Sequence, residues 1–318
     1  MPQVVTVFGG SGFIGRYVVR ELAKAGYRVR VAVRRPNLAS YVLVAGQVGQ
    51  IQVVKCDVHD SEDVAAALRG ADHAINLVGV LQSFGRQSFT ALHVAAARTI
   101  ANAAAEHGLD RLIHFSAIGA AKDSASSYAA SKALGEEAVR AAMPGATILR
   151  PSIVFGPEDQ FFNRFAAMAR FAPVLPLIGG GTTRFQPVFV GDVARAACVC
   201  LNNPATAAKT YELGGPDIYS FKQLMQIMLR VICRRRLLLP VPFGVAGVLG
   251  SVLRMLPNAP ITADQVRLLK TDNVVGADAP SLADLGIEPD SAEAILPSYL
   301  WRFRPHGQYE REAAQPVT

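Results

Sequence analysis

The segment Val4–Gly15 decides the fold of this chain, and it reads Val-Val-Thr-Val-Phe-Gly-Gly-Ser-Gly-Phe-Ile-Gly. Its first five residues are an apolar, β-branched run typical of a buried parallel strand, and glycines follow at positions 9, 12 and 15. Glycines at this spacing between a strand and a helix permit a tight turn and a close approach of the backbone to a pyrophosphate. The helix that follows offers N–H groups to the phosphates. The segment therefore predicts a dinucleotide-binding unit, in preference to an ordinary turn.

Outward from this segment, apolar strand-like runs alternate with Ala-rich helical runs. We expect strands at 3–8, 28–33, 51–56, 73–78, 111–116 and 146–150, and helices near 13–25, 61–69, 88–107 and 127–142. This alternation predicts the α/β class, with a Rossmann-type doubly wound parallel sheet and a smaller, irregular C-terminal lobe. We expect the nucleotide-binding core at 1–150, with later segments returning to it, the lobe at 151–305 and a tail at 306–318.

Composition excludes several classes of protein. With 318 residues, 51% of them hydrophobic and 18% charged, the chain is too apolar to be disordered and long enough for a large core. Four cysteines without a C-x-x-C pair argue against a disulfide framework or a metal site. A strand-like run begins almost at the first Met, so we expect no targeting segment. The apolar stretch 237–253 is shorter than the ~20 residues of a spanning helix, which predicts a soluble or peripheral protein.

The net charge of +7 is compatible with a nucleic acid, an acidic membrane surface or a phosphorylated ligand. Nucleic acid is disfavoured, because the arginines are not interleaved with aromatic residues and no recognition-helix module is present. A basic cluster of Arg230, Arg234, Arg235 and Arg236 precedes an apolar stretch. This pattern predicts that Arg230–Leu256 contacts anionic lipid at a membrane surface, or a partner protein. The alternative is a core helix with a solvated basic approach.

Arg34 and Arg35 follow the second expected strand, where NAD-binding proteins usually carry an acidic residue for the ribose hydroxyl. Two guanidinium groups suit a 2′-phosphate, so we expect NADPH in preference to NADH. The alternative is a solvated basic loop before Pro36. Asp57 follows the third expected strand, where it is placed to accept a hydrogen bond from adenine or to cap the next helix.

With these residues in view, the chain resembles the extended or atypical branch of the short-chain dehydrogenase/reductase superfamily. The matching motifs are Gly9-x-x-Gly12-x-x-Gly15, Asp57-Val58 and Tyr128-Ala-Ala-Ser-Lys132, with further matches at 149–157, 187–194 and 211–216. The resemblance implies that Tyr128 and Lys132 lie beside the nicotinamide and its ribose, with Lys132 lowering the pKa of Tyr128. The implied cofactor-binding residues are Gly9, Ser11, Gly12, Phe13, Ile14, Gly15, Arg34, Arg35, Asp57, Val58, Leu77, Gly79, Ser116, Tyr128, Lys132, Pro151 and Ile153.

The sequence departs from the catalytic pattern of that superfamily at two positions. Ser116 stands at a strand end, whereas the family's catalytic hydroxyl is one or two places later, where this chain has Ala117 and Ile118. His93 occupies the position of an Asn on the preceding helix. A proton relay built for one side chain does not transfer to another by default. We therefore expect Tyr128 and Lys132 to be vestigial or cofactor-binding only; for Tyr128 the alternative is a surface aromatic residue.

Residues 156–165, 185–190 and 261–275 look like those of the NADPH-binding accessory subunit of respiratory complex I, subunit 9 of the NADH dehydrogenase alpha subcomplex. This resemblance implies a structural NADPH, no catalysis of its own, and other complex I subunits near the quinone site as partners. It also implies a peripheral location on the cytoplasmic face of a bacterial inner membrane. The alternatives are a free-standing NADP-dependent reductase or sugar epimerase/dehydratase, and a sensor of the NADPH/NADP⁺ ratio.

Overall fold

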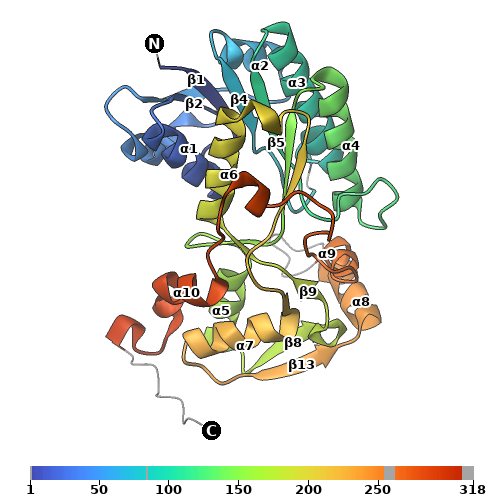
Figure 1. The fold of residues 1–318 in the computed structure, drawn as a ribbon. Coiled ribbons are helices and arrows are strands. Elements are labelled where there is room, and N and C mark those ends of the chain that lie inside the picture. The colour runs from blue at the N-terminus through green and yellow to red at the C-terminus, as the bar shows by residue number, and fades with distance from the viewer. Residues whose placement is uncertain (1, 84, 254–261, 310–318) are drawn as a thin grey trace. The chain divides into compact units, whose positions relative to one another are not determined.

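The computed structural model describes residues 2–83, 85–253 and 262–309 (Figure 1). Two expectations extend beyond these ranges. Residues 254–256 of the predicted membrane-contacting segment and 310–318 of the predicted tail lie outside the described residues. The chain divides into two compact units, each described by itself below. The first unit comprises 1–151, 190–213 and 275–288, and the second comprises 152–189, 214–274 and 289–318.

A seven-stranded parallel sheet forms the centre of the first unit, with the strand order β11-β6-β5-β4-β1-β2-β3. This sheet confirms the predicted α/β, doubly wound fold class. Six of its strands are apolar, β-branched runs of the sequence and lie within two residues of the expected bounds, whereas β11 was not predicted as a strand. The strands are β1 (Val4–Phe8), β2 (Arg28–Val33), β3 (Ile51–Lys55), β4 (His73–Asn76), β5 (Arg111–Phe115), β6 (Thr147–Pro151) and β11 (Thr210–Leu213).

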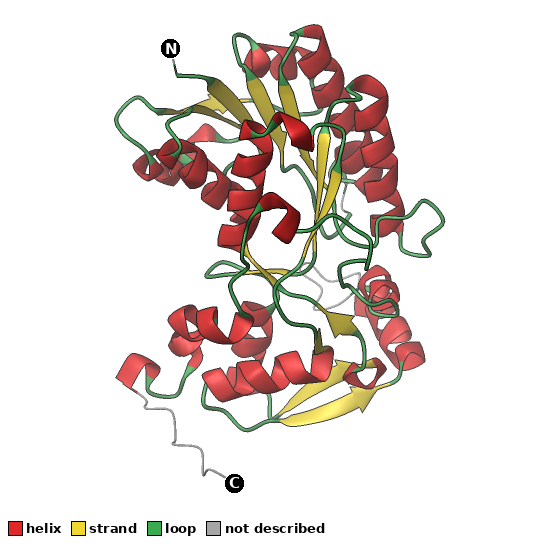
Figure 2. Ribbon diagram, viewed as in Figure 1, coloured by secondary structure: helices red, strands yellow, loops and turns green. Residues whose placement is uncertain are grey.

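Helices cover both faces of this sheet (Figures 1 and 2). On one face α1 packs on α6, and on the other α2, α3 and α4 pack in succession. Asp60 caps α2 and Ser126 caps α4 through their side chains, as the short polar residues at these positions favour. The helices are α1 (Phe13–Lys24), α2 (Ser61–Leu68), α3 (Ala96–Glu106), α4 (Ser127–Ala142) and α6 (Val190–Asn202).

The helix expected at 88–107 is divided in the structure. Its first part is a π-helical turn at Thr90–Ala95, and the regular helix α3 begins only at Ala96. At this turn two backbones pack closely, because a Cβ atom on Gly135 of α4 would lie 2.1 Å from the carbonyl oxygen of His93. Such π-bulges are frequent at functional sites.

The second unit has an aromatic core, in which Phe161 contacts the rings of Phe162, Phe165, Phe185 and Phe221. Its strands form three two-stranded pairings, β10 with β7, β12 with β9 and β13 with β8. The strands are β7 (Val154–Phe155), β8 (Val174–Ile178), β9 (Arg184–Phe185), β10 (Val188–Phe189), β12 (Tyr219–Ser220) and β13 (Leu237–Val241). The helices are α5 (Phe162–Phe171), α7 (Phe221–Val231), α8 (Phe243–Leu253), α9 (Ala263–Leu268), α10 (Ala292–Ile295) and α11 (Pro297–Leu300).

Within the described ranges, the helices are all too short or too polar to cross a membrane.

Candidate functional site

The strand order reverses between β1 and β4, because the chain continues to β2 and β3 on one side and to β5 and β6 on the other. In open α/β sheets, ligands bind at the carboxyl ends of the strands beside such a reversal. The glycine-rich turn after β1 and the segment after β4 lie at this point. The N–H of Leu77 donates to the carbonyl of Phe8 at 3.0 Å, which places the two segments side by side.

The glycine-rich turn has the tight geometry that its sequence predicts. Gly9 has a φ of +79°, which favours glycine, and Gly12 N–H donates to the Gly9 carbonyl at 2.9 Å. A Cβ atom on Gly15 would lie 2.4 Å from the Gly9 oxygen, so no larger residue fits there. The N-cap of α1 is Gly12, without a side-chain hydrogen bond, and its first turn has no acidic residue. The N–H groups at this helix start are therefore suited to a phosphate.

Gly79, Lys132 and His93 come together at the end of β4. A Cβ atom on Gly79 would lie 3.3 Å from Lys132 Nζ and 3.5 Å from His93 Nε2. Lys132 is buried, and its Nζ donates to the Phe115 carbonyl at 3.0 Å. Desolvation lowers the pKa of Lys132 to about 8, and the nearby Glu136 carboxylate opposes this change.

The resemblance implied that Lys132 lowers the pKa of Tyr128, and this expectation is wrong for the structure. Burial raises the pKa of Tyr128 to about 12, because desolvation disfavours the phenolate. The Lys132 ammonium is directed to the Phe115 carbonyl. Near neutral pH Tyr128 is therefore a neutral phenol, which can donate a hydrogen bond or a proton but cannot act as a base.

His93 is held by hydrogen bonds at both ring nitrogens. The Val80 N–H donates to Nε2 at 3.1 Å, and Nδ1 lies 2.8 Å from Ser131 Oγ. Because Ser131 Oγ donates its own proton to the Tyr128 carbonyl at 2.7 Å, Nδ1 must carry the proton of the ring. Burial, and then the charge of Lys132, lower the pKa of His93 to about 3. His93 is therefore a fixed neutral tautomer.

Two aromatic rings, those of Phe89 and Tyr128, pack against the imidazole of His93. Phe89 stacks on His93 with ring centroids 5.4 Å apart, and the Tyr128 ring meets both rings edge-on at 5.8 and 5.5 Å. Sequence reasoning assigned no role to Phe89 or Ser131. Ser131 could have been identified because it lies inside the Tyr128–Lys132 motif. No motif in the sequence indicates a role for Phe89.

Ser116 lies at the end of β5 and is 5% exposed, and its Oγ has no hydrogen-bond partner among the described residues. Its N–H is bound to the Leu149 carbonyl at 2.8 Å, and the Ile118 N–H to the Pro151 carbonyl at 3.1 Å. Positions 117 and 118 carry no hydroxyl. A buried, unpaired hydroxyl at the strand end is a candidate partner for a ligand.

Arg34 and Arg35 are exposed directly after β2, and the guanidinium group of neither forms a hydrogen bond or ion pair with the described residues. Of the two roles considered for Asp57, helix capping falls to Asp60, whose side chain accepts from the N–H groups of Glu62 and Asp63. The Asp57 carboxylate instead accepts from the N–H of His59 at 3.1 Å.

The sheet gathers most of the predicted site residues at one edge of the first unit. They lie at or just beyond the carboxyl ends of β1, β2, β3, β4, β5 and β6, or on the first turns of α1 and α4. Ser11, Phe13 and Ile14 are half-buried in the turn, Val58 is buried after β3, and Pro151 ends β6. Ile153 belongs to the second unit. Among the described residues there is also no group of three His, Cys, Asp or Glu side chains that could hold a metal ion.

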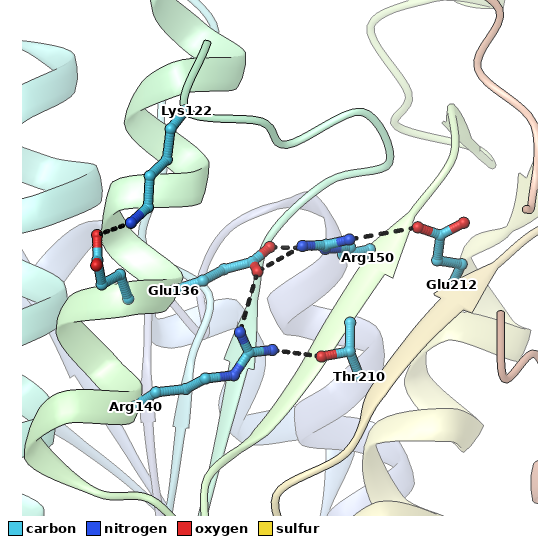
Figure 3. Close-up of polar contacts among 7 residues, drawn as sticks. Lys122, Glu136, Arg140, Arg150, Thr210 and Glu212 are labelled. Carbon is cyan, nitrogen blue, oxygen red and sulfur yellow. Dashed lines mark hydrogen bonds and ion pairs between the residues drawn. The ribbon is translucent and has the colours of Figure 1, made fainter. Parts of the chain in front are cut away.

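The α4 helix that carries Tyr128 and Lys132 is fixed by an ion-pair network (Figure 3). Glu136 is buried and accepts two hydrogen bonds from Arg150 of β6, at 2.8 and 2.7 Å. Arg150 also contacts Glu212 of β11 at 3.5 Å, and Arg140 donates to Thr210. This bidentate pairing sets the position of α4 on the sheet.

Comparisons with known proteins agree with this geometry. The sequence model of the NAD dependent epimerase/dehydratase family matches residues 5–214. The Arabidopsis thaliana protein named NADH dehydrogenase (ubiquinone) 1 alpha subcomplex subunit 9, mitochondrial, is 36% identical over 96% of this chain and 79% of its own length. A ceramide reductase of Caulobacter vibrioides is 31% identical over 81% of this chain and 80% of its own length.

Solved structures share the fold. The dTDP-glucose 4,6-dehydratase DesIV from Streptomyces venezuelae, with NAD and TYD bound, has a TM-score of 0.72 and is 22% identical. The likeness covers 95% of this chain and 96% of the dehydratase chain.

Proposed function

We propose a function on the premise that this chain belongs to the NAD dependent epimerase/dehydratase family, and within it to the family of the alpha subcomplex subunit 9 proteins of NADH dehydrogenase. The chain is an NADPH-binding accessory subunit of a proton-pumping NADH:quinone oxidoreductase. It supports the assembly and stability of that complex near the quinone site, and it transfers no hydride. The observation that carries the proposal is the 36% identity over 96% of the chain to such a subunit.

The site geometry supports a binding role without catalysis. The position of the family's Asn is taken by His93, whose two ring nitrogens are occupied by Val80 and Ser131. Tyr128 has a raised pKa, and no hydroxyl stands at positions 117 and 118. In this proposal Tyr128 and Lys132 act only as ligands of the nicotinamide and its ribose.

The choice of NADPH over NADH rests on the end of β2. Val33 is followed by the exposed guanidinium groups of Arg34 and Arg35, and no carboxylate stands where it would repel a 2′-phosphate. A phosphate carries almost two negative charges and pairs well with planar guanidinium groups.

The second unit presents a surface suited to a membrane or to an apolar partner. Leu237 and Leu239 of β13 are 73% and 57% exposed, and Val245 and Val248 of α8 are 53% and 66% exposed. Phe171 is 83% exposed near the start of β13, where Leu237 N–H binds the Pro173 carbonyl. We call the five side chains Phe171, Leu237, Leu239, Val245 and Val248 the apolar face. Scattered single apolar residues need no explanation, but here exposed apolar residues recur on one strand, β13, and on the apolar helix α8, which favours contact.

The basic residues near this face do not all serve the same role. Arg234 Nε donates to the Phe303 carbonyl at 3.0 Å and Arg236 Nε to the Ala169 carbonyl at 2.8 Å, so both fold onto the protein. Arg170, Arg230 and Arg235 are exposed and suit anionic headgroups. This supports a peripheral location, on the cytoplasmic face of the inner membrane in a bacterium.

Solubilisation of native membranes with a mild detergent tests the proposal. We expect this chain to co-migrate with NADH:quinone oxidoreductase subunits on a native gel, identified by mass spectrometry, and we expect its deletion to reduce the amount of assembled complex. Recovery of the chain only as a soluble monomer would contradict the proposal.

The ceramide reductase relative favours one second candidate, an NADPH-dependent carbonyl reductase. The accessory subunit and the carbonyl reductase differ in whether the chain oxidises NADPH with a carbonyl substrate. If the purified chain oxidises NADPH with a ceramide precursor ketone or another carbonyl compound, and Tyr128→Phe abolishes that rate, the chain is a reductase. No turnover, together with retained NADPH in both proteins, supports the accessory role.

A further inference from the structure

The net charge of the whole chain is concentrated in its first 56 residues. These hold eight of the 32 Lys and Arg residues but only one of the 25 Asp and Glu residues. The rest of the chain is therefore neutral, with 24 residues of each sign. The single acid, Glu21, is paired with Lys24 at 2.8 Å. The segment that forms β1, α1, β2 and β3 thus carries the whole excess of +7, which favours an anionic ligand.

One arginine of this segment is held at the glycine-rich turn. Arg16 lies in the first turns of α1, and its N–H binds the Gly12 carbonyl at 3.1 Å. Its guanidinium stacks over the ring of Tyr41 at 4.9 Å, and its Nη2 lies 3.4 Å from the Tyr41 hydroxyl. Tyr41 belongs to a short 3₁₀ helix, Ser40–Ala45, and its hydroxyl donates to the Ser11 carbonyl of the turn. Tyr41 therefore joins Arg16, the turn and the connection after β2.

The same connection begins with Arg34 and Arg35. The Gly9 N–H donates to the Ala32 carbonyl at 3.4 Å, so the end of β2 lies beside the turn that Arg16 follows. Stacking on an aromatic ring restricts a guanidinium to one plane, which reduces the entropy lost when it binds a phosphate. The turn is therefore flanked in the chain by Arg16 on α1 and lies beside the end of β2, after which Arg34 and Arg35 follow.

We propose that Arg16 is a third guanidinium that binds the 2′-phosphate of NADPH with Arg34 and Arg35, and that Tyr41 is the positioning residue that holds Arg16 for it. This inference rests on the proposed binding of NADPH. It adds a specificity-determining residue from α1 and explains why the 3₁₀ helix at Ser40–Ala45 is tied to the glycine-rich turn.

Isothermal titration calorimetry tests the inference. The full chain is freed of nucleotide and titrated with NADPH and, separately, with NADH. Arg16→Met is expected to weaken NADPH binding by about 10–100-fold, because it removes one charged hydrogen-bonding group. It should change NADH binding by less than about threefold, because NADH has no 2′-phosphate. Tyr41→Phe, which keeps the ring but removes the anchoring hydroxyl, is expected to cause a smaller, equally NADPH-selective loss. Equal losses for the two nucleotides, or none for either, would overturn the inference.

Arg20→Met is the matched control, because Arg20 lies one turn further on α1 and stacks over Tyr17 at 4.7 Å. It should leave both affinities unchanged. If Arg16→Met fails to fold, Arg16→Lys decides, because it keeps the charge but loses the planar fork; full NADPH affinity in Arg16→Lys contradicts the assigned role.

The outcomes separate this inference from the proposed cofactor. If the unmodified chain binds NADH as tightly as NADPH, the proposed cofactor itself is wrong. If it prefers NADPH, and replacing Arg34 and Arg35 with Ala removes the preference while Arg16→Met preserves it, only the role of Arg16 is wrong.

Discussion

Cys233 follows the C-terminal end of α7 with a φ of +53°, a conformation that favours glycine. The hydrogen bonds from Cys233 N–H to Arg230 O and from Arg234 N–H to Leu229 O form the usual helix-ending motif, in which glycine is the preferred residue at this position. Cys233→Gly is therefore expected to raise the free energy of unfolding by roughly 0.5–1 kcal/mol. Urea unfolding measures this change. Cys233→Ala keeps the Cβ atom, and a gain of the same size there would show that strain is not the cause.

His93 and His114 make the stability of the fold sensitive to acid. Burial lowers the pKa of each to about 3, whereas an unfolded histidine titrates near 6.5. Between these values the unfolded chain binds protons that the folded chain does not, so stability is complete above pH 6.5 and falls as the pH decreases. Each histidine is expected to reduce the free energy of unfolding by about 1 kcal/mol between pH 7.5 and 5.5.

Unfolding midpoints at these two pH values test this expectation. His114→Gln should lose less stability on acidification than the unmodified chain, and the exposed His59→Gln should lose the same amount. An unchanged acid loss in His114→Gln would contradict the assignment. Desolvation raises the pKa of the buried Asp159. The folded chain therefore binds a proton at this carboxyl more readily than the unfolded chain, and this group opposes the loss of stability on acidification.

At the scale of the elements, α4 depends on Glu136. Breaking a buried ion pair leaves an uncompensated charge, so Glu136→Gln is expected to lower the free energy of unfolding by about 3 kcal/mol. Glu137→Gln on the same helix is the matched control (Figure 3), because its pair with Lys122 is exposed at both ends and contributes about 0–1 kcal/mol. Chemical denaturation compares the two. Equal losses would show that the Glu136–Arg150 pair does not hold α4.

The sequence allowed six strands and the glycine-rich turn to be predicted because both are local patterns. A buried parallel strand is a continuous apolar run, and Gly9, Gly12 and Gly15 follow one within a few residues. The edge strand β11 and the π-helical turn at Thr90–Ala95 were not predicted, and the turn packs against Gly135, 42 positions after His93, a contact that no local pattern indicates. Likewise, the position of His93 was identified, but its hydrogen bonds come from Val80 and Ser131 on other segments.

At the scale of the whole molecule, the second unit is expected to bind anionic membranes. In flotation assays with vesicles containing phosphatidylglycerol or cardiolipin, binding should decrease as salt increases, because exposed charges are screened. Combined Arg230→Gln and Arg235→Gln should weaken it by about 30-fold, at ~1 kcal/mol for each charge near the surface. Arg20→Gln, an exposed charge in the first unit, is the control. Binding that changes with neither salt nor these substitutions would contradict the role of the arginines, and no binding to vesicles at all would contradict the membrane contact.

The hydrogen bonds of His93 also limit which side chains can replace it. Val80, Ser131 and the aromatic ring of Phe89 are all fitted to an imidazole at position 93. A shorter side chain at this position would leave the Val80 N–H without its acceptor, at a cost of ~1–3 kcal/mol. A change from His93 to the Asn of the family pattern therefore requires coordinated substitutions at its neighbours, through less stable intermediates.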